Sequence, residues 1–92
     1  MENTEIRCLT IVNEKGLHAR ASAQLVETVE KYDAKATVFK DGMDACGDSI
    51  MGLLMLAASK GTQIEIRVKG HQAKELANAL EDLIKSRFGE SS

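Results

Sequence analysis

The sequence predicts a single α+β domain in two layers, with the element order βαββαβα. Two observations lead to this prediction. The chain has 92 residues, which is enough for one domain, assigned here to residues 1–92. Segments that alternate between apolar and polar residues also interleave with segments of helical spacing. Because the strands alternate, one face of the sheet should be wet. We therefore expect an antiparallel sheet with three helices on its other face.

The first strand and the first helix are expected on either side of a tight turn. Residues 6–12 are rich in β-formers, with Leu9 and Ile11 directed toward the core. Residues 13–16 (Asn-Glu-Lys-Gly) have the composition of a turn. Residues 19–31 carry apolar side chains at helical spacing and charged side chains between them, which indicates an amphipathic helix.

A β-hairpin is predicted in the middle of the chain. Residues 34–40 alternate in the manner of a strand, and residues 43–46 can form a short return strand. Asp41 and Gly42 separate the two, and Asp-Gly is typical of a type I′ turn because glycine accepts the positive φ that this turn requires.

Three further elements complete the chain. A short helix is expected over residues 50–57, with Ser49 as its N-cap and Gly61 as its C′ residue. Residues 62–69 alternate as a strand with one wet face. Residues 72–87 have the apolar spacing of a last amphipathic helix.

Composition excludes several classes of function. The net charge of -2 and an aromatic content of 3% argue against nucleic-acid binding. No segment approaches the roughly 20 apolar residues of a membrane span, and no secretion signal is recognised, so a cytoplasmic location is expected. Cys8 and Cys46 do not suit a disulfide framework or a metal site. We expect no metal and no cofactor, and interpret His71 as a solvated residue at a helix start.

His18 is the first candidate functional residue. It lies where a strand leads into a helix, and the unpaired N–H groups of a helix start attract anions. A neutral imidazole is a competent nucleophile, and the Arg20 guanidinium can hold phosphate oxygens. Together with the backbone of Ala19 and Arg20, these groups suit a phosphorylated histidine. The spacing alone also fits the simpler interpretation that His18 is an ordinary polar surface residue.

The segment Gly16-Leu17-His18-Ala19-Arg20-Ala21-Ser22-Ala23 resembles the active-site signature of the histidine-containing phosphocarrier (HPr) family of the bacterial phosphotransferase system. The resemblance extends over nearly the whole chain. It implies an open-faced β-sandwich with a four-stranded antiparallel sheet. It also implies that His18 accepts a phosphoryl group on Nδ1 from enzyme I and passes it to a histidine of an enzyme IIA, while Arg20 stabilises the group. Such a chain is a relay and not an independent enzyme.

One residue departs from the signature. The commonest pattern in the family has proline after the arginine, and this chain has Ala21. Alanine is the best helix former and can adopt the angles that proline presets, so we expect the chemistry to be retained.

Ser49 is the second candidate. A serine at a helix N-cap has an ordinary structural role, worth about 1 kcal/mol. The segment also resembles the regulatory serine motif of the family, which a dedicated kinase phosphorylates in many members. This makes Ser49 a candidate phosphorylation site and a serine kinase/phosphorylase a candidate partner. Asp48, where many members have a basic residue, weakens the match to kinase recognition.

The segment after Ser49 is too apolar for a helix with one wet face, so part of it should form an exposed apolar patch. The alternative is that both of its faces are buried by the other two helices. The resemblance favours exposure and docking to enzyme I around His18. The residues predicted to bind partners are Leu17, Ile50, Met51, Gly52, Leu54 and Met55. We expect the carrier to act as a monomer.

Two further alternatives concern the role of the chain. In the family that the chain resembles, one branch feeds sugar-transporting enzymes II and the nitrogen-related branch (NPr) feeds a regulatory enzyme IIA. Residues 53–61 look more like the nitrogen-related branch, whereas the motif around Ser49 is compatible with kinase control, so the branch stays open. A regulatory binding module that acts through the surface of the second helix, without a phosphorelay, is the alternative from a different class. His18 and Arg20 argue against it.

Overall fold

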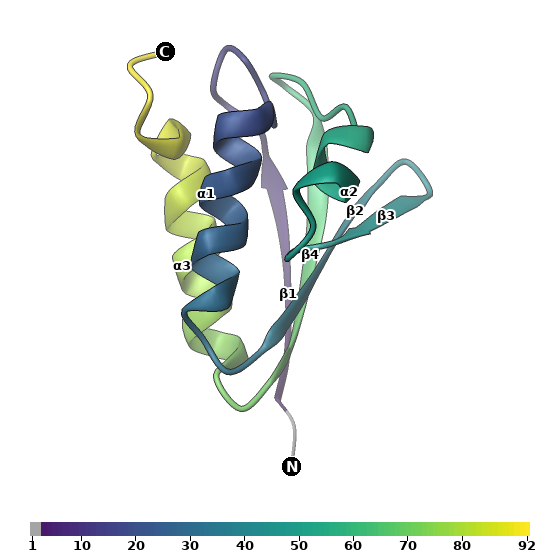
Figure 1. The fold of residues 1–92 in the computed structure, drawn as a ribbon, viewed down its shortest axis with the longest axis vertical. Helices are drawn as coiled ribbons and strands as arrows, with labels where there is room; N and C mark the ends of the chain where they lie inside the picture. Colours follow the sequence, from purple (N-terminus) through teal and green to yellow (C-terminus); the bar gives the residue numbers. More distant parts are fainter. Residues whose placement is uncertain (1–2) are drawn as a thin grey trace.

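The protein is described here by a computed structural model that covers residues 3–92, so residues 1 and 2 of the predicted domain lie outside the described part. The order βαββαβα is confirmed (Figure 1). The elements are β1 (Asn3–Thr10), α1 (Ala19–Glu30), β2 (Lys35–Lys40), β3 (Met43–Cys46), α2 (Ile50–Met55), β4 (Gln63–Gly70) and α3 (Ala73–Lys85), followed by a 3-10 turn, η1 (Arg87–Gly89).

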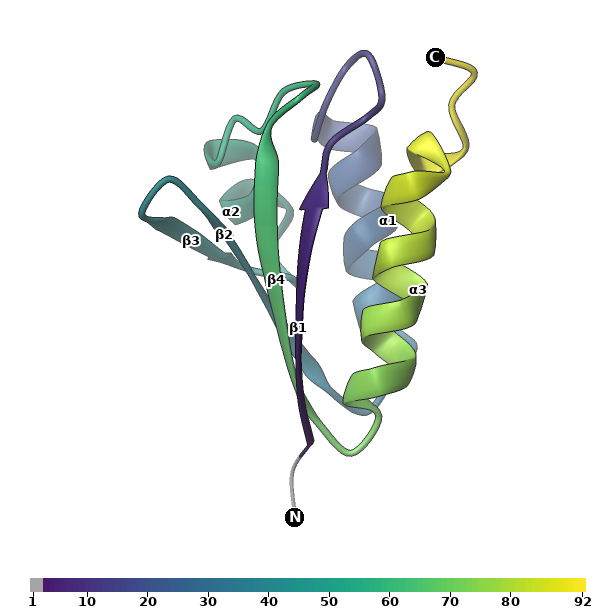
Figure 2. The same ribbon diagram turned by 180° about the vertical axis from the view of Figure 1, so that it is seen from behind.

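The four strands form one antiparallel sheet in the order β1-β4-β2-β3. Helices α1 and α3 lie side by side along one face of this sheet, and the two opposite views agree on this (Figures 1 and 2). Alternate residues of the central strands, such as Val38 and Ile66, are fully buried beneath the helices. The predicted α+β architecture with helices on one face is therefore confirmed, and the core is almost entirely aliphatic.

The hairpin forms as predicted. Val38 pairs with Ala45 and Lys40 with Met43, so Asp41 and Gly42 make the two-residue connection. Both have positive φ, 49° and 78°, as a type I′ turn requires.

Two predicted boundaries are corrected. The β1 ladder ends at Thr10, but Ile11 is fully buried as expected and its N–H donates to the Thr62 carbonyl at 2.9 Å. The predicted C′ role of Gly61 is wrong, because α2 ends earlier and Ala57 takes the left-handed conformation, with φ 51°. The Lys40 ammonium donates to the Leu56 carbonyl at 2.9 Å, which satisfies a terminal carbonyl of this short helix.

The end of the last helix also differs from the prediction. Helix α3 stops at Lys85, and the chain then turns through η1, where Phe88 has φ 54° and is buried. The buried ring anchors this turn to the core. As a result, the C-terminal segment lies near the start of α1 (Figure 1). The periodicity of the sequence does not reveal this change of direction.

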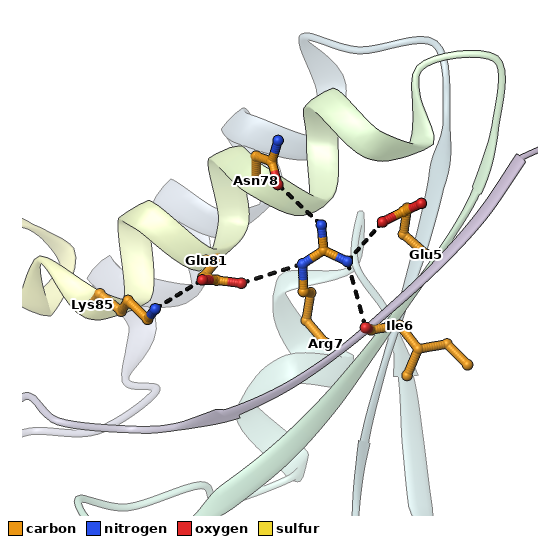
Figure 3. A network of polar contacts seen from close by, with 6 residues as sticks. All are labelled: Glu5, Ile6, Arg7, Asn78, Glu81 and Lys85. Carbon is orange, nitrogen blue, oxygen red and sulfur yellow. Dashed lines mark hydrogen bonds and ion pairs between the residues drawn. The ribbon is translucent and has the colours of Figure 1, made fainter.

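An ion-pair network joins the edge strand β1 to α3 (Figure 3). The Arg7 guanidinium donates to Glu5 at 2.7 Å and to Asn78 at 3.0 Å, and lies 3.2 Å from a Glu81 oxygen. Glu81 is also paired with Lys85 at 2.8 Å. Arg7 lies on the face of the sheet that the helices cover, near the edge of the sheet. There its guanidinium makes polar contacts to α3 where an apolar side chain would otherwise pack.

Candidate phosphoryl-acceptor site

His18 occupies the N-cap position of α1, with φ -79° and ψ -177°. Its carbonyl accepts the first helical hydrogen bond, from the Ser22 N–H at 2.8 Å. The N–H groups of Ala19 and Arg20 consequently precede the helical ladder and have no partner within the helix. The His18 side chain does not cap the helix, which leaves its ring available for other contacts.

The turn before His18 packs closely against the loop that follows α2. Gly16 has φ 64°, and a Cβ atom there would lie 2.5 Å from the Ala58 carbonyl oxygen. The Leu17 N–H donates to that same oxygen at 2.8 Å. The Leu17 side chain is only 3% exposed, so its predicted role in partner binding is corrected: it belongs to the core and anchors the turn.

The His18 ring contacts a residue that sequence reasoning missed. Its Nε2 lies 2.6 Å from Oε2 of Glu90, which comes from the segment after η1. This hydrogen bond, followed by a second one from Asn13, lowers the pKa of the Glu90 carboxyl below its ordinary value. Because 72 residues separate the two partners, no local pattern indicates the contact.

Arg20 lies in the same open hollow as His18 and Glu90, together with Lys15. Its side chain is exposed, and it makes no hydrogen bond or ion pair to any residue between 3 and 92. The guanidinium is therefore available to an incoming anion.

Ser49 is the N-cap of α2, as predicted. Its Oγ accepts a hydrogen bond from the Gly52 N–H at 3.0 Å. Because the hydroxyl oxygen is already engaged with the helix start, any modification of Ser49 acts directly on this cap.

Three side chains of α2 form an exposed apolar patch, which we call the α2 patch: Ile50 (40% exposed), Met51 (70%) and Met55 (76%). Leu53 is fully buried, whereas Gly52 and Leu54 are half-buried. The alternative in which both faces of this helix are buried is therefore wrong. Helix α2 contacts α1 and lies beside its N-terminal half (Figure 1), so the patch and His18 belong to the same end of the molecule.

The other histidine and the two cysteines lie on the surface. Cys8 and Cys46 are free and exposed, and His71 is exposed. Residues 3–92 contain no group of three potential metal-ligating side chains. None of the helices in the described part of the chain is long and apolar enough to span a bilayer.

The fold and site define a small α+β domain that presents a histidine at a helix start, with an exposed arginine in the same hollow and an apolar patch on a neighbouring helix. A family model described as "PTS HPr component phosphorylation site" matches residues 6–86. The chain is 42% identical to a phosphocarrier protein HPr of Xylella fastidiosa, over 91% of this chain and 94% of that protein. It is 36% identical to a phosphocarrier protein NPr of Shewanella violacea, over 94% of each chain.

The solved structure of an HPr from Thermoanaerobacter tengcongensis superposes with a TM-score of 0.91 at 36% identity, covering 96% of this chain and 99% of that one. The chain therefore belongs to the HPr family of phosphocarrier proteins. Membership supports a phosphocarrier role in the phosphotransferase system and not a catalytic role in the usual sense.

Proposed function

We propose that His18 accepts a phosphoryl group on Nδ1 from a phosphohistidine of enzyme I and passes it to a histidine of an enzyme IIA. The observation that carries this proposal is the place of His18, at the N-cap of α1 with its Nε2 engaged by Glu90 and its ring partly exposed. The Nδ1 lone pair forms the new P–N bond. The P–N bond of the donor breaks, and its electron pair returns to the donor nitrogen.

The helix start supplies the electrostatic support for this step. The N–H groups of Ala19 and Arg20 and the positive end of the helix dipole favour a dianionic group held on His18. The Arg20 guanidinium can bind two phosphoryl oxygens at once and has no competing partner among residues 3–92. Ala21 is fully buried in the first turn of α1, and this supports the expectation that it replaces proline without loss of the helix start.

The α2 patch is the proposed docking surface for both enzymes. Its exposed apolar side chains belong to α2, which contacts α1, and methionine adapts well to more than one partner. Gly52 and Leu54 lie at its half-buried margin. A relay needs brief contacts, and a patch of three side chains suits a small, transient interface of a monomeric carrier.

Labelled phosphoenolpyruvate with enzyme I tests the relay. We expect an acid-labile, base-stable label on the wild-type chain and on the His71→Ala control, and none on His18→Ala. Replacing Met51 with aspartate should raise the KM for the carrier while the folded state is retained. A folded wild-type chain that takes up no label from active enzyme I would refute the relay. It would favour the non-relay binding module that acts through the α2 surface.

Phosphorylation of Ser49 by a serine kinase is the proposed regulation. A phosphate on Oγ would place about two negative charges at the margin of the α2 patch, next to the Asp48 carboxylate. Docking of enzyme I should then weaken through repulsion and occlusion, without unfolding. Ser49→Glu is expected to raise the KM of transfer from enzyme I, whereas Ser59→Glu, on the exposed loop after α2, serves as the control. Equal KM values for the two variants would exclude this regulation.

A further inference from the structure

Asn13 links two distant segments at the site. It is fully buried in the turn between β1 and α1. Its Nδ2 donates to the Gly16 carbonyl at 2.8 Å and to Oε1 of Glu90 at 3.0 Å. One amide nitrogen therefore holds both the turn that leads into His18 and the C-terminal segment that contacts the His18 ring.

The orientation of this amide follows from its two partners. Both are oxygen atoms that can only accept, so the NH2 group must face them. A flipped amide would place Oδ1 against the Gly16 carbonyl and the Glu90 carboxylate, which would repel it. Oδ1 is buried and has no hydrogen-bond partner among residues 3–92. The two hydrogen bonds that Nδ2 donates therefore determine the orientation of the Asn13 amide.

The contact with Asn13 leaves the second oxygen of Glu90 to face the histidine. Oε2 lies 2.6 Å from Nε2 of His18. An ionised carboxylate only accepts hydrogen bonds, so Nε2 must carry the proton. In the neutral ring the lone pair then lies on Nδ1, because only one of the two ring nitrogens is protonated.

We propose that Asn13 is a positioning residue that holds Glu90 against Nε2 of His18 and so keeps the Nδ1 lone pair available. The inference rests on the proposed function of His18 as the phosphoryl acceptor. During transfer the Nε2 proton stays in place while Nδ1 forms the P–N bond and the donor P–N bond breaks. The ring thereby gains positive charge next to the Glu90 carboxylate, which stabilises it. A buried carboxylate orients a catalytic imidazole in the same way in other proteins.

The direct test is the 15N NMR spectrum of the His18 ring in the unphosphorylated protein, at a pH where the ring is neutral. We expect a protonated Nε2 and an unprotonated Nδ1 in the wild-type chain. Glu90→Ala and Asn13→Ala should each mix the two tautomers and lower the rate of transfer from enzyme I by about tenfold, as for other partners that orient a histidine. Glu14→Gln, which removes the exposed partner of Lys60 from the same turn, is the matched control and should change neither.

The double variant separates positioning from a structural role. If Asn13 acts through Glu90, adding Asn13→Ala to Glu90→Ala changes neither the tautomer mixture nor the rate any further. Additive effects of the two substitutions on the tautomer mixture and the rate would overturn the inference. So would a His18 15N spectrum in Glu90→Ala that is the same as in the wild-type chain, and this variant should fold because Glu90 lies at the exterior. The NMR measurement needs no phosphoryl donor. A wild-type chain with the expected tautomer that takes up no label would therefore refute the proposed function and leave the positioning of the ring intact.

Discussion

Replacing Gly16 with alanine should destabilise the protein more than the same change at another glycine of positive φ. A non-glycine residue in the left-handed region costs roughly 1–2 kcal/mol, partly offset by about 0.4–1 kcal/mol from the stiffer unfolded chain. Gly42→Ala carries only this cost, because outside its chain neighbours no atom of the described residues lies within 4 Å of the new Cβ. At Gly16 the new Cβ meets the Ala58 carbonyl oxygen at 2.5 Å.

The close contact at Gly16 destabilises the Gly16→Ala variant further. The Ala58 oxygen belongs to the backbone and accepts the Leu17 N–H at 2.8 Å, so it cannot move without weakening that bond. Overpacking of this kind typically costs about 1–3 kcal/mol. The free energy of unfolding of Gly16→Ala should therefore fall below that of Gly42→Ala by about 1–3 kcal/mol, and Tm by at least about 4 °C, since 1 kcal/mol shifts Tm by about 4–8 °C in a domain of this size.

Urea and thermal unfolding followed by circular dichroism measure both variants against the wild-type chain. The urea m-value should stay constant, because neither substitution should change how much surface is exposed on unfolding. If Gly16→Ala is no less stable than Gly42→Ala, the close approach of the two loops does not constrain the turn that precedes His18.

Three other outcomes are expected. Ser49→Ala should lower the free energy of unfolding by about 1 kcal/mol through loss of the α2 cap; an unchanged urea midpoint would contradict this. Leu53→Ala should cost roughly 2–5 kcal/mol, whereas Met51→Ala, on the exposed face of the same helix, should stay within about 0.5 kcal/mol, and similar values for both would show that α2 is not packed as described. The Glu90 carboxyl should titrate below its ordinary pKa of 4.5, so its contribution to stability is present above that pH and lost as the pH falls through the lowered pKa; a titration by 13C NMR at or above 4.5 would refute the contact with His18.

Most of the fold could be predicted because its signals are local. Alternation along β4 and helical spacing along α3 each place the apolar side chains on one face of the element. These patterns can be recognised without knowing the rest of the fold. The Asp41-Gly42 turn and the Ser49 cap rest on the φ and hydrogen-bonding preferences of single residues. The prediction of Gly61 as the C′ residue was wrong for the opposite reason. A carbonyl at the end of α2 accepts a hydrogen bond from Lys40, which comes from a different element, and no local pattern indicates this contact.

The same distinction between local and distant signals applies to the candidate site. The sequence by itself determined that His18 stands at a helix start with Arg20 two residues further on. It also determined that the helix after Ser49 has too many apolar residues to bury them all. It could not determine that Leu17 is buried, or that Glu90 reaches the imidazole, because both depend on segments far away in the chain. Only the tertiary structure brings the turn of Asn13 and the end of the chain together. In the proposed mechanism, the buried Asn13 amide then holds Glu90 against Nε2 and so keeps the lone pair on Nδ1.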